Sequence, residues 1–215
     1  NGTQNVIEAC LTNDVKKCLL ISTDKAVNPV NLYGASKLVA EKITLGGNAL
    51  SGKNGTIFGI VRYGNVLGSR GSILPFFSNL NKENKKIPIT HPDMTRFWIS
   101  YDDAVEFINS SLINTRRGDI FIPKLNSIKI NEFVKILNPK AKTYITGKKK
   151  GEKIHEELIT QEESQYVKKT RNNYIVNFDL KKKNKNNFSY SSKDNLFNAK
   201  NPIKSSYIKI IKNFI

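Results

Sequence analysis

Two spacings of hydrophobic residues alternate along the first half of the chain. Near the start, Val6, Ile7, Cys10 and Leu11 recur at the three- and four-residue intervals of an amphipathic helix. Apolar runs without polar alternation, such as CLLIS, are typical of strands buried on both faces. The expected helices span residues 1–13, 31–50, 73–80 and 101–113, and the expected strands span residues 18–22, 56–63 and 119–123. This order predicts an α/β fold in which a parallel sheet carries helices on both faces.

The pattern becomes shorter and less regular after Pro123. The elements expected there are a helix at 129–137, a strand at 141–146, a basic turn at 147–153, a helix at 154–158, a strand at 172–178, a loop at 180–187 and a helix at 203–215. These pieces look too fragmentary to bury a core of their own. We therefore expect a soft boundary between residues 1–123, which hold most of the sheet, and a smaller α+β part at residues 124–215.

Charge and composition exclude several classes of protein. The 215 residues carry a formal net charge of +17, but residues 1–125 account for only +5 of it. Lysines outnumber arginines 29 to 6, and no nucleic-acid-binding signature accompanies them, so no nucleic-acid partner is expected. No window approaches 18 uninterrupted apolar residues, so no membrane span is expected. Cys10 and Cys18 lack metal-ligand spacing, which favours free thiols, no metal site and a cytoplasmic location.

The stretch LLISTDKAVNPVNLYGASK places a cluster of reactive groups directly after a buried strand. Tyr33 and Lys37 stand four residues apart on the expected helix, so they share one face. A free phenol is a poor base at neutral pH, and a nearby ammonium favours the phenolate. Thr23 ends the preceding strand, where open parallel sheets bind their ligands. The cluster therefore indicates proton transfer to and from an alcohol.

Four motifs give the chain a resemblance to a known family. They are STDKAVNPVNLYGASK, VRYGNVLGSRGSILPFF, PITHPDMTRFWIS and GEKIHEEL, in this order along the chain. The set resembles the extended short-chain dehydrogenases/reductases, and more narrowly the inverting UDP-N-acetylglucosamine 4,6-dehydratases that begin pseudaminic acid synthesis. The resemblance covers roughly residues 1–165. It implies a Rossmann-like NAD(P)-binding domain over residues 1–123 and a small substrate-binding part over residues 124–215.

The resemblance also implies roles for individual residues. The catalytic residues would be Thr23, Asp24, Lys25, Tyr33 and Lys37. Residues expected to line the cofactor are Tyr33, Lys37, Tyr63, Gly64, Asn65 and Val66, and those expected on the substrate are Asn65, Ser72, Arg96, Lys149 and Glu152. Dehydratases that act on dTDP-glucose carry Glu where this chain has Lys25, which favours UDP-N-acetylglucosamine. Lys149 replaces an arginine of the relatives and keeps its charge, although it loses the bidentate fork.

The implied reaction is an elimination of water through a transient ketone. Tyr33 would accept the proton of the sugar 4-hydroxyl while hydride passes to NADP, with NAD as the alternative. Lys25 would then remove the C5 proton, and Asp24 would protonate the departing C6 hydroxyl. Return of the hydride and reprotonation from the opposite face give a 4-keto-6-deoxy sugar inverted at C5. The enzyme would be a lyase acting on a nucleotide sugar.

One motif of the family is missing from the chain. A dinucleotide-binding fold needs a Gly-rich turn after its first strand, and no G-x-G-x-x-G occurs here. We expect about a hundred preceding residues, or several ~30-residue βαβ units, to belong to the complete enzyme, which we expect to be a homo-oligomer. Two alternatives remain open: a nucleotide-sugar epimerase or reductase of the same superfamily, or an inactive truncated remnant that lacks the cofactor cradle.

Overall fold

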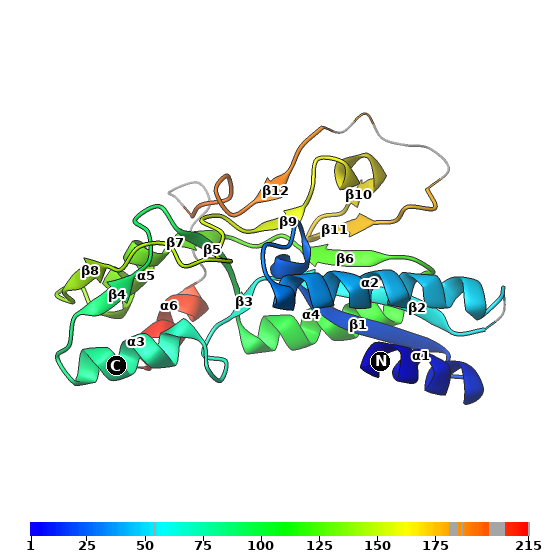
Figure 1. Ribbon diagram of the computed structural model, residues 1–215, viewed down its shortest axis with the longest axis horizontal. Coiled ribbons are helices and arrows are strands. Elements are labelled where there is room, and N and C mark those ends of the chain that lie inside the picture. Colours follow the sequence, from blue (N-terminus) through cyan, green and yellow to red (C-terminus); the bar gives the residue numbers. More distant parts are fainter. Residues whose placement is uncertain (54, 181–184, 186, 198–204, 215) are drawn as a thin grey trace. The chain divides into compact units, whose positions relative to one another are not determined.

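The chain packs into two compact units, each built from three separate segments. The computed structural model describes residues 1–53, 55–180, 185, 187–197 and 205–214. The first unit comprises Asn1–Tyr63, Val105–Lys124 and Glu157–Tyr190, and the second comprises Gly64–Ala104, Leu125–Glu156 and Ser191–Ile215 (Figure 1). The functional division expected between residues 123 and 124 stays a prediction, because it concerns roles rather than packing.

A five-stranded sheet forms the centre of the first unit. Its order is β1 (Lys17–Thr23), β2 (Ile57–Tyr63), β6 (Ile120–Pro123), β11 (Asn173–Val176) and β10 (Val167–Lys169). The first three strands are parallel, and β11 and β10 are each antiparallel to their neighbour. The register pairs Thr23 with Tyr63, so β1 and β2 end level with each other. The expected parallel sheet is therefore confirmed, with two antiparallel strands added at one side.

Helices cover both faces of this sheet, as predicted. On one face α1 (Gly2–Thr12) and α2 (Leu32–Leu50) pack around Phe58 of β2. On the other face α4 (Tyr101–Asn114) brings Phe107 against Val61 and Phe121. Because successive side chains of a strand point to opposite faces, Phe58 and Val61 divide the core into two layers. Cys10 and Cys18 are free thiols at the α1 face.

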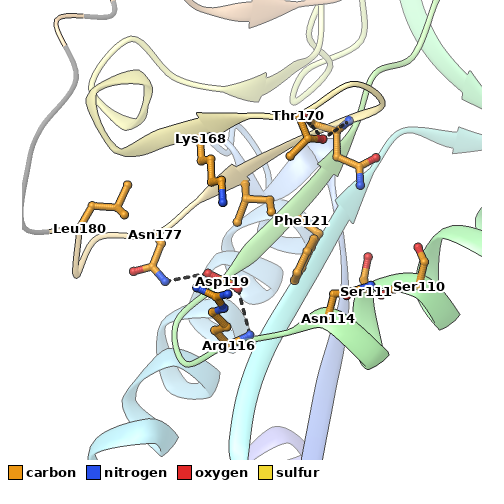
Figure 2. A pocket seen from close by; sticks show the side chains of 12 residues that line it. Ser110, Ser111, Asn114, Arg116, Asp119, Phe121, Lys168, Thr170, Asn177 and Leu180 are labelled. Carbon is orange, nitrogen blue, oxygen red and sulfur yellow. Dashed lines mark hydrogen bonds between the residues drawn. The ribbon is translucent and has the colours of Figure 1, made fainter.

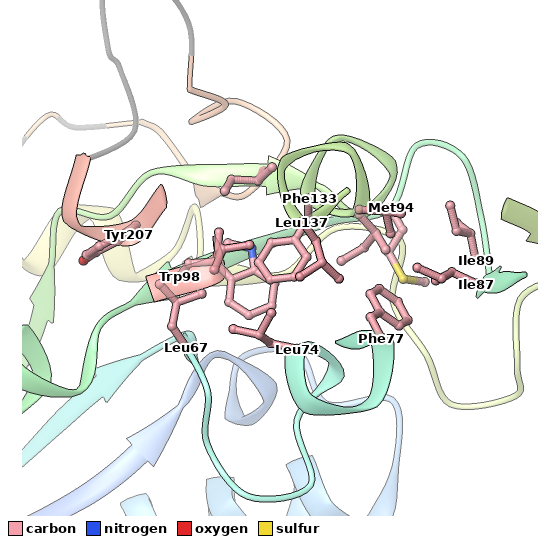
Figure 3. Close-up of a cluster of buried hydrophobic side chains, with 14 residues drawn as sticks. Leu67, Leu74, Phe77, Ile87, Ile89, Met94, Trp98, Phe133, Leu137 and Tyr207 are labelled. Atoms are coloured by element: carbon pink, nitrogen blue, oxygen red, sulfur yellow. The ribbon is translucent and has the colours of Figure 1, made fainter. Parts of the chain in front are cut away.

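The second unit has a hydrophobic core of its own (Figure 3). Its strands are β3 (Asn65–Val66), β4 (Ile87–Ile89), β5 (Thr95–Ile99), β7 (Ser127–Lys129) and β8 (Thr143–Ile145), and its helices are α3 (Ile73–Lys82), α5 (Ile130–Leu137) and α6 (Ser205–Lys212). Strands β3, β5 and β7 form one small sheet, and β4 pairs with β8 in another. Trp98 is buried and stacks on Phe133 with ring centroids 4.5 Å apart. The late elements thus share their core with residues 67–98.

One expected helix is wrong. Residues 154–158 read as helical, but Glu157–Ile159 forms the strand β9, beside β12 (Tyr190–Ser191). The backbone of Glu156 pairs with a distant extended segment, because its carbonyl accepts a hydrogen bond from the Ser192 N–H at 2.8 Å. Five residues hold little more than one helical turn, so long-range pairing outweighs the local pattern. The described residues also form two short 3₁₀ turns, η1 (Asp24–Ala26) and η2 (Glu163–Tyr166).

The expected terminal helix is confirmed over Ser205–Lys212, while residues 203, 204 and 215 lie outside the described residues. Most of the loop expected at 180–187 also lies outside them. Among the helices of the described residues, none combines the length and the apolar character that crossing a membrane requires.

Candidate functional site

In the first unit, three predicted catalytic residues form a hydrogen-bonded group where β1 ends. Asp24 begins the turn η1 and its side chain is fully buried. Its Oδ1 accepts hydrogen bonds from the Thr23 hydroxyl at 2.9 Å and from the Lys25 ammonium at 3.0 Å. Its Oδ2 has no hydrogen-bond partner within the described part of the chain. Asp24 therefore has one oxygen held in place by two hydrogen bonds and one buried oxygen whose hydrogen-bonding capacity is unused in the described residues.

The helix α2 begins in close contact with this group. Its N-cap is Asn31, whose side-chain oxygen accepts a hydrogen bond from the Gly34 N–H at 2.8 Å. A Cβ added to Gly34 would lie 2.3 Å from the carbonyl oxygen of Lys25. Only a glycine permits this approach. The sequence motif YGASK thus brings the start of α2 against the turn that carries Asp24 and Lys25.

Tyr33, Lys37 and Tyr63 lie around the same ends of β1 and β2. Lys37 donates a hydrogen bond from Nζ to the carbonyl of Ile21 at 2.7 Å, so its amine reaches the end of β1. Tyr33 is 55% exposed, which leaves its ring accessible. Burial raises the pKa of Tyr63, and the nearby Tyr33 raises it further. No hydrogen bond joins Tyr33 to Lys37 within the described residues, and their catalytic roles stay predictions.

In the second unit, β3 carries the predicted residues that follow Tyr63. Gly64 passes so close to β5 that an added Cβ would lie 2.5 Å from the Cβ of Phe97. Asn65 and Val66 form β3 and pair with Trp98 and Ile99. The Asn65 side-chain oxygen and the Ser72 hydroxyl are buried, and neither has a hydrogen-bond partner in the described residues. Their predicted roles in cofactor and substrate binding stay predictions.

Arg96 occupies a different environment from the one that a diphosphate contact suggests. Its side chain is largely buried on β5, and it donates to the carbonyls of Lys153 at 2.9 Å and Ile154 at 3.1 Å. These bonds hold the segment that contains Lys149 and Glu152. Lys149 itself is exposed, and its N–H donates to the Glu152 carboxylate. In this conformation Arg96 supports the expected substrate loop, and its contact with a diphosphate stays a prediction.

A second polar group on β5 involves His155. The Thr95 hydroxyl lies 2.8 Å from Nδ1 of His155 and 2.6 Å from the Ser192 hydroxyl. Burial lowers the pKa of His155, and the positive charge of Lys193 lowers it further. The imidazole is thus engaged by a neighbouring side chain, and it joins the 153–156 segment to β5.

A hollow of about 480 Å³ opens in the first unit away from the predicted residues (Figure 2). Its lining includes the carboxylate of Asp119, which accepts hydrogen bonds from the Asn177 amide at 2.7 Å and from the Arg116 N–H at 2.9 Å. Asp119 precedes β6, at the amino end of the parallel strands, whereas Thr23 stands at the carboxyl end of β1. None of the predicted site residues lines this hollow.

Sequence reasoning missed a buried ionic cluster next to the predicted site. Arg62 of β2 lies between the carboxylates of Glu41 and Glu163 and is 2% exposed. A signal was present, since an arginine inside the apolar run GIVRY needs a buried carboxylate as partner. Glu41, one helical turn after Lys37, is one of the two carboxylate residues nearest to Arg62 along the chain, each 21 positions away.

The parallel sheet with helices on both faces is a Rossmann-like α/β fold, the class of fold found in solved nucleotide-sugar dehydratases and epimerases. Within that class, the chain belongs to the polysaccharide biosynthesis protein family, which residues 1–178 match. The resemblance inferred from the four motifs is therefore confirmed at the level of family and fold.

The chain is also similar in sequence to individual nucleotide-sugar enzymes. The chain is 44% identical over 213 residues to the UDP-N-acetylglucosamine 4,6-dehydratase (inverting) of Campylobacter jejuni, covering 91% of this chain and 64% of the relative. It is 38% identical over 182 residues to the UDP-glucose 4-epimerase of Rickettsia bellii, covering 83% of this chain and 53% of the relative. The chain thus spans less than two thirds of the length of these proteins.

Solved structures agree on the fold. The X-ray structure of Pen from Bacillus thuringiensis superposes with a TM-score of 0.86 at 34% identity, covering 99% of this chain and 67% of that one. DesIV, a dTDP-glucose 4,6-dehydratase from Streptomyces venezuelae with NAD and TYD bound, gives a TM-score of 0.64 at 20% identity, covering 71% of this chain and 54% of that one.

Proposed function

We propose that the protein containing this chain is a nucleotide-sugar 4,6-dehydratase that acts on UDP-N-acetylglucosamine and inverts C5. One observation carries this proposal: a buried Asp24 shares one oxygen with Thr23 and Lys25 and keeps the other unbonded. An epimerase needs no acid of this kind, because no hydroxyl leaves. The 44% identity to an inverting UDP-N-acetylglucosamine 4,6-dehydratase supports the same substrate.

The chain fits the reactive end of a nicotinamide cofactor. Tyr33 is accessible, and the Lys37 amine reaches the end of β1. When bound, NADP supplies a reversible hydride acceptor for the alcohol carbon. Tyr33 accepts the hydroxyl proton in that step, Thr23 hydrogen-bonds the same oxygen, and Lys37 places positive charge beside the phenolate. NADP rather than NAD is part of the proposal.

The Lys25–Asp24 pair supplies both groups that the elimination needs. In the resting ion pair, the Lys25 ammonium lies 3.0 Å from Asp24 Oδ1. Transfer of one proton across this contact gives a neutral amine and a carboxylic acid, with no proton taken from solvent. Lys25 then removes the C5 proton made acidic by the 4-ketone, and Asp24 protonates the C6 oxygen, which leaves as water. The Lys25 amine gains one proton and the Asp24 carboxylic acid loses one, so the two side chains return to the ion pair.

A product analysis tests the proposal. Full-length protein containing this chain is incubated with UDP-N-acetylglucosamine and either NADP or NAD, and the products are followed by mass spectrometry and NMR. The dehydratase gives a nucleotide sugar lighter by one water, with a 4-ketone and the C5 proton exchanged with solvent. A product of unchanged mass with only C4 inverted would establish the epimerase instead, which the Rickettsia bellii relative favours.

The proposal also covers the cellular location and the oligomeric state of the protein. We place the enzyme in the cytoplasm, where nucleotide sugars and reduced thiols such as Cys10 and Cys18 are found. We also expect the full-length protein to be a homo-oligomer, which size-exclusion chromatography with light scattering measures directly. A monomer with full activity would contradict that part.

A further inference from the structure

Four polar side chains of the first unit form a buried cluster, here called the Arg62 cluster, made of Arg62, Glu41, Glu163 and Ser22. Arg62 donates to the Glu41 carboxylate through Nε at 3.1 Å and Nη2 at 2.7 Å, and to Glu163 through Nη1 at 3.0 Å. A further N–H of Arg62 reaches the carbonyl of Leu158 at 3.0 Å. The Ser22 hydroxyl donates to Glu41 Oε1 at 2.5 Å. The cluster therefore joins β1, β2, α2 and the 158–163 segment.

The guanidinium of Arg62 stays charged in this buried position. Burial opposes the charge, but the carboxylates of Glu163 and Glu41 outweigh it and raise the pKa of Arg62 above its ordinary value. A guanidinium holds its N–H groups in a rigid plane, so each carboxylate is fixed in direction as well as distance. An ammonium in the same place keeps the charge and loses this directional fork.

Every strand or helix residue of the cluster is next to, or one helical turn from, a predicted site residue. Ser22 is followed by Thr23, and Arg62 is followed by Tyr63. Glu41 lies one helical turn beyond Lys37, on the helix α2 that also carries Tyr33. The register of the sheet pairs Ser22 with Arg62 and Thr23 with Tyr63, so the cluster residues and the predicted site residues of β1 and β2 occupy consecutive rows.

We propose that the Arg62 cluster is a positioning device that fixes α2 against β1 and β2, and thereby sets the distance between Tyr33 and Thr23. None of its members needs to touch the substrate. Its effect on turnover rests on the proposed function, whereas its effect on the mobility of α2 does not. A misplacement of about 1 Å is enough to lower a rate by about 100-fold, so a small rotation of α2 suffices.

The kinetic test compares Arg62→Lys with the matched control Arg117→Lys. Arg117 also ties distant segments of the first unit, through Asn48, Ser51, Lys53 and Gly55, but adjoins no predicted catalytic residue. In full-length protein, Arg62→Lys should lower kcat by about 10- to 100-fold with KM close to wild type. Arg117→Lys should keep the wild-type kcat. Equal kcat in the two variants would overturn the proposal.

A second experiment tests whether the Arg62 cluster positions α2 without measuring catalytic turnover. Amide hydrogen exchange, followed by mass spectrometry, should accelerate in Arg62→Lys within peptides covering residues 18–24 and 32–41. Arg117→Lys should accelerate exchange only around residues 44–58. Should Arg62→Lys fail to fold, Glu41→Gln is measured instead, since an amide fills the same space. Unchanged exchange over residues 32–41 would refute positioning, whereas wild-type protein inactive on UDP-N-acetylglucosamine would refute only the proposed function.

Discussion

The ammonium of Lys25 lies 3.0 Å from Oδ1 of Asp24, a carboxylate that is completely buried. The second oxygen, Oδ2, has no hydrogen-bond partner in the described residues. Burying a carboxylate oxygen without a hydrogen bond costs free energy, and such a cost is typical of sites that bind a ligand.

Replacing Asp24 by asparagine should remove the acid and leave the shape of the site unchanged. Product formation from UDP-N-acetylglucosamine should fall by about 100- to 10,000-fold, the usual contribution of a positioned general acid. Asp93→Asn is the control, because Asp93 also pairs with a lysine, Lys129 at 3.1 Å, on the surface of the second unit. Wild-type turnover in Asp24→Asn would remove this residue from the mechanism.

Tyr33→Phe should lower turnover sharply and leave the fold intact. The ring is 55% exposed and its hydroxyl makes no hydrogen bond within the described residues, so the melting temperature should be unchanged. The rate should fall by about 100- to 10,000-fold, because the proton acceptor is lost. The exposed Tyr101 serves as control, and Tyr101→Phe should retain full activity. A Tyr33→Phe variant with wild-type kcat would show that another group accepts the proton.

Two glycines of α2 should respond in opposite ways to alanine. At Gly34 the added Cβ would meet the Lys25 carbonyl at 2.3 Å, and overpacking of this kind costs about 1–3 kcal/mol. At Gly46 nothing lies within 4 Å of the added Cβ, so alanine should stabilise the helix by about 0.5–1 kcal/mol. Urea denaturation of both variants measures the difference. Equal stabilities would mean that α2 does not approach η1 so closely.

His155 should make the second unit less stable in mild acid. Burial first, and then the charge of Lys193, lower the folded-state pKa of His155 below its ordinary value near 6.5, while Asp93 and Asp194 oppose this. The unfolded chain therefore binds more protons just below pH 6.5, and stability should fall as pH falls through that window.

Thermal unfolding of wild type and His155→Gln at pH 7.5 and 5.5 measures this contribution. The loss of melting temperature on acidification should be smaller in His155→Gln than in wild type. An identical pH dependence in the two proteins would contradict the assignment of the effect to His155.

Sequence patterns predicted the long elements well, because burial of one face dictates their spacing. The helix starting at Leu32 and the strand ending at Thr23 are close to their expected bounds. Short strands such as β4, β7 and β10 escaped prediction, since three residues carry too little periodicity to identify them.

In the candidate site, too, the sequence predicted groupings of adjacent residues and missed contacts between distant ones. Thr23, Asp24 and Lys25 are adjacent in sequence, so their grouping followed from the motif. The hydrogen bond between Arg62 and Glu163 joins residues that are 101 positions apart, so no local spacing in the sequence predicts it. For Arg96 the motif predicted a contact with the substrate diphosphate. It could not predict that the guanidinium donates hydrogen bonds to the carbonyls of Lys153 and Ile154.

The pairing of Ser22 with Arg62 and of Thr23 with Tyr63 has an evolutionary consequence. Neighbouring residues of a strand face opposite sides of the sheet, so inserting one residue in the middle of β2 would move Arg62 opposite Thr23, and deleting one would move Tyr63 opposite Ser22. The insertion would bring the guanidinium to the reactive edge, and the deletion would bury a phenol beside Glu41. Length changes should therefore accumulate in the loops of this chain and be purged from residues 57–63.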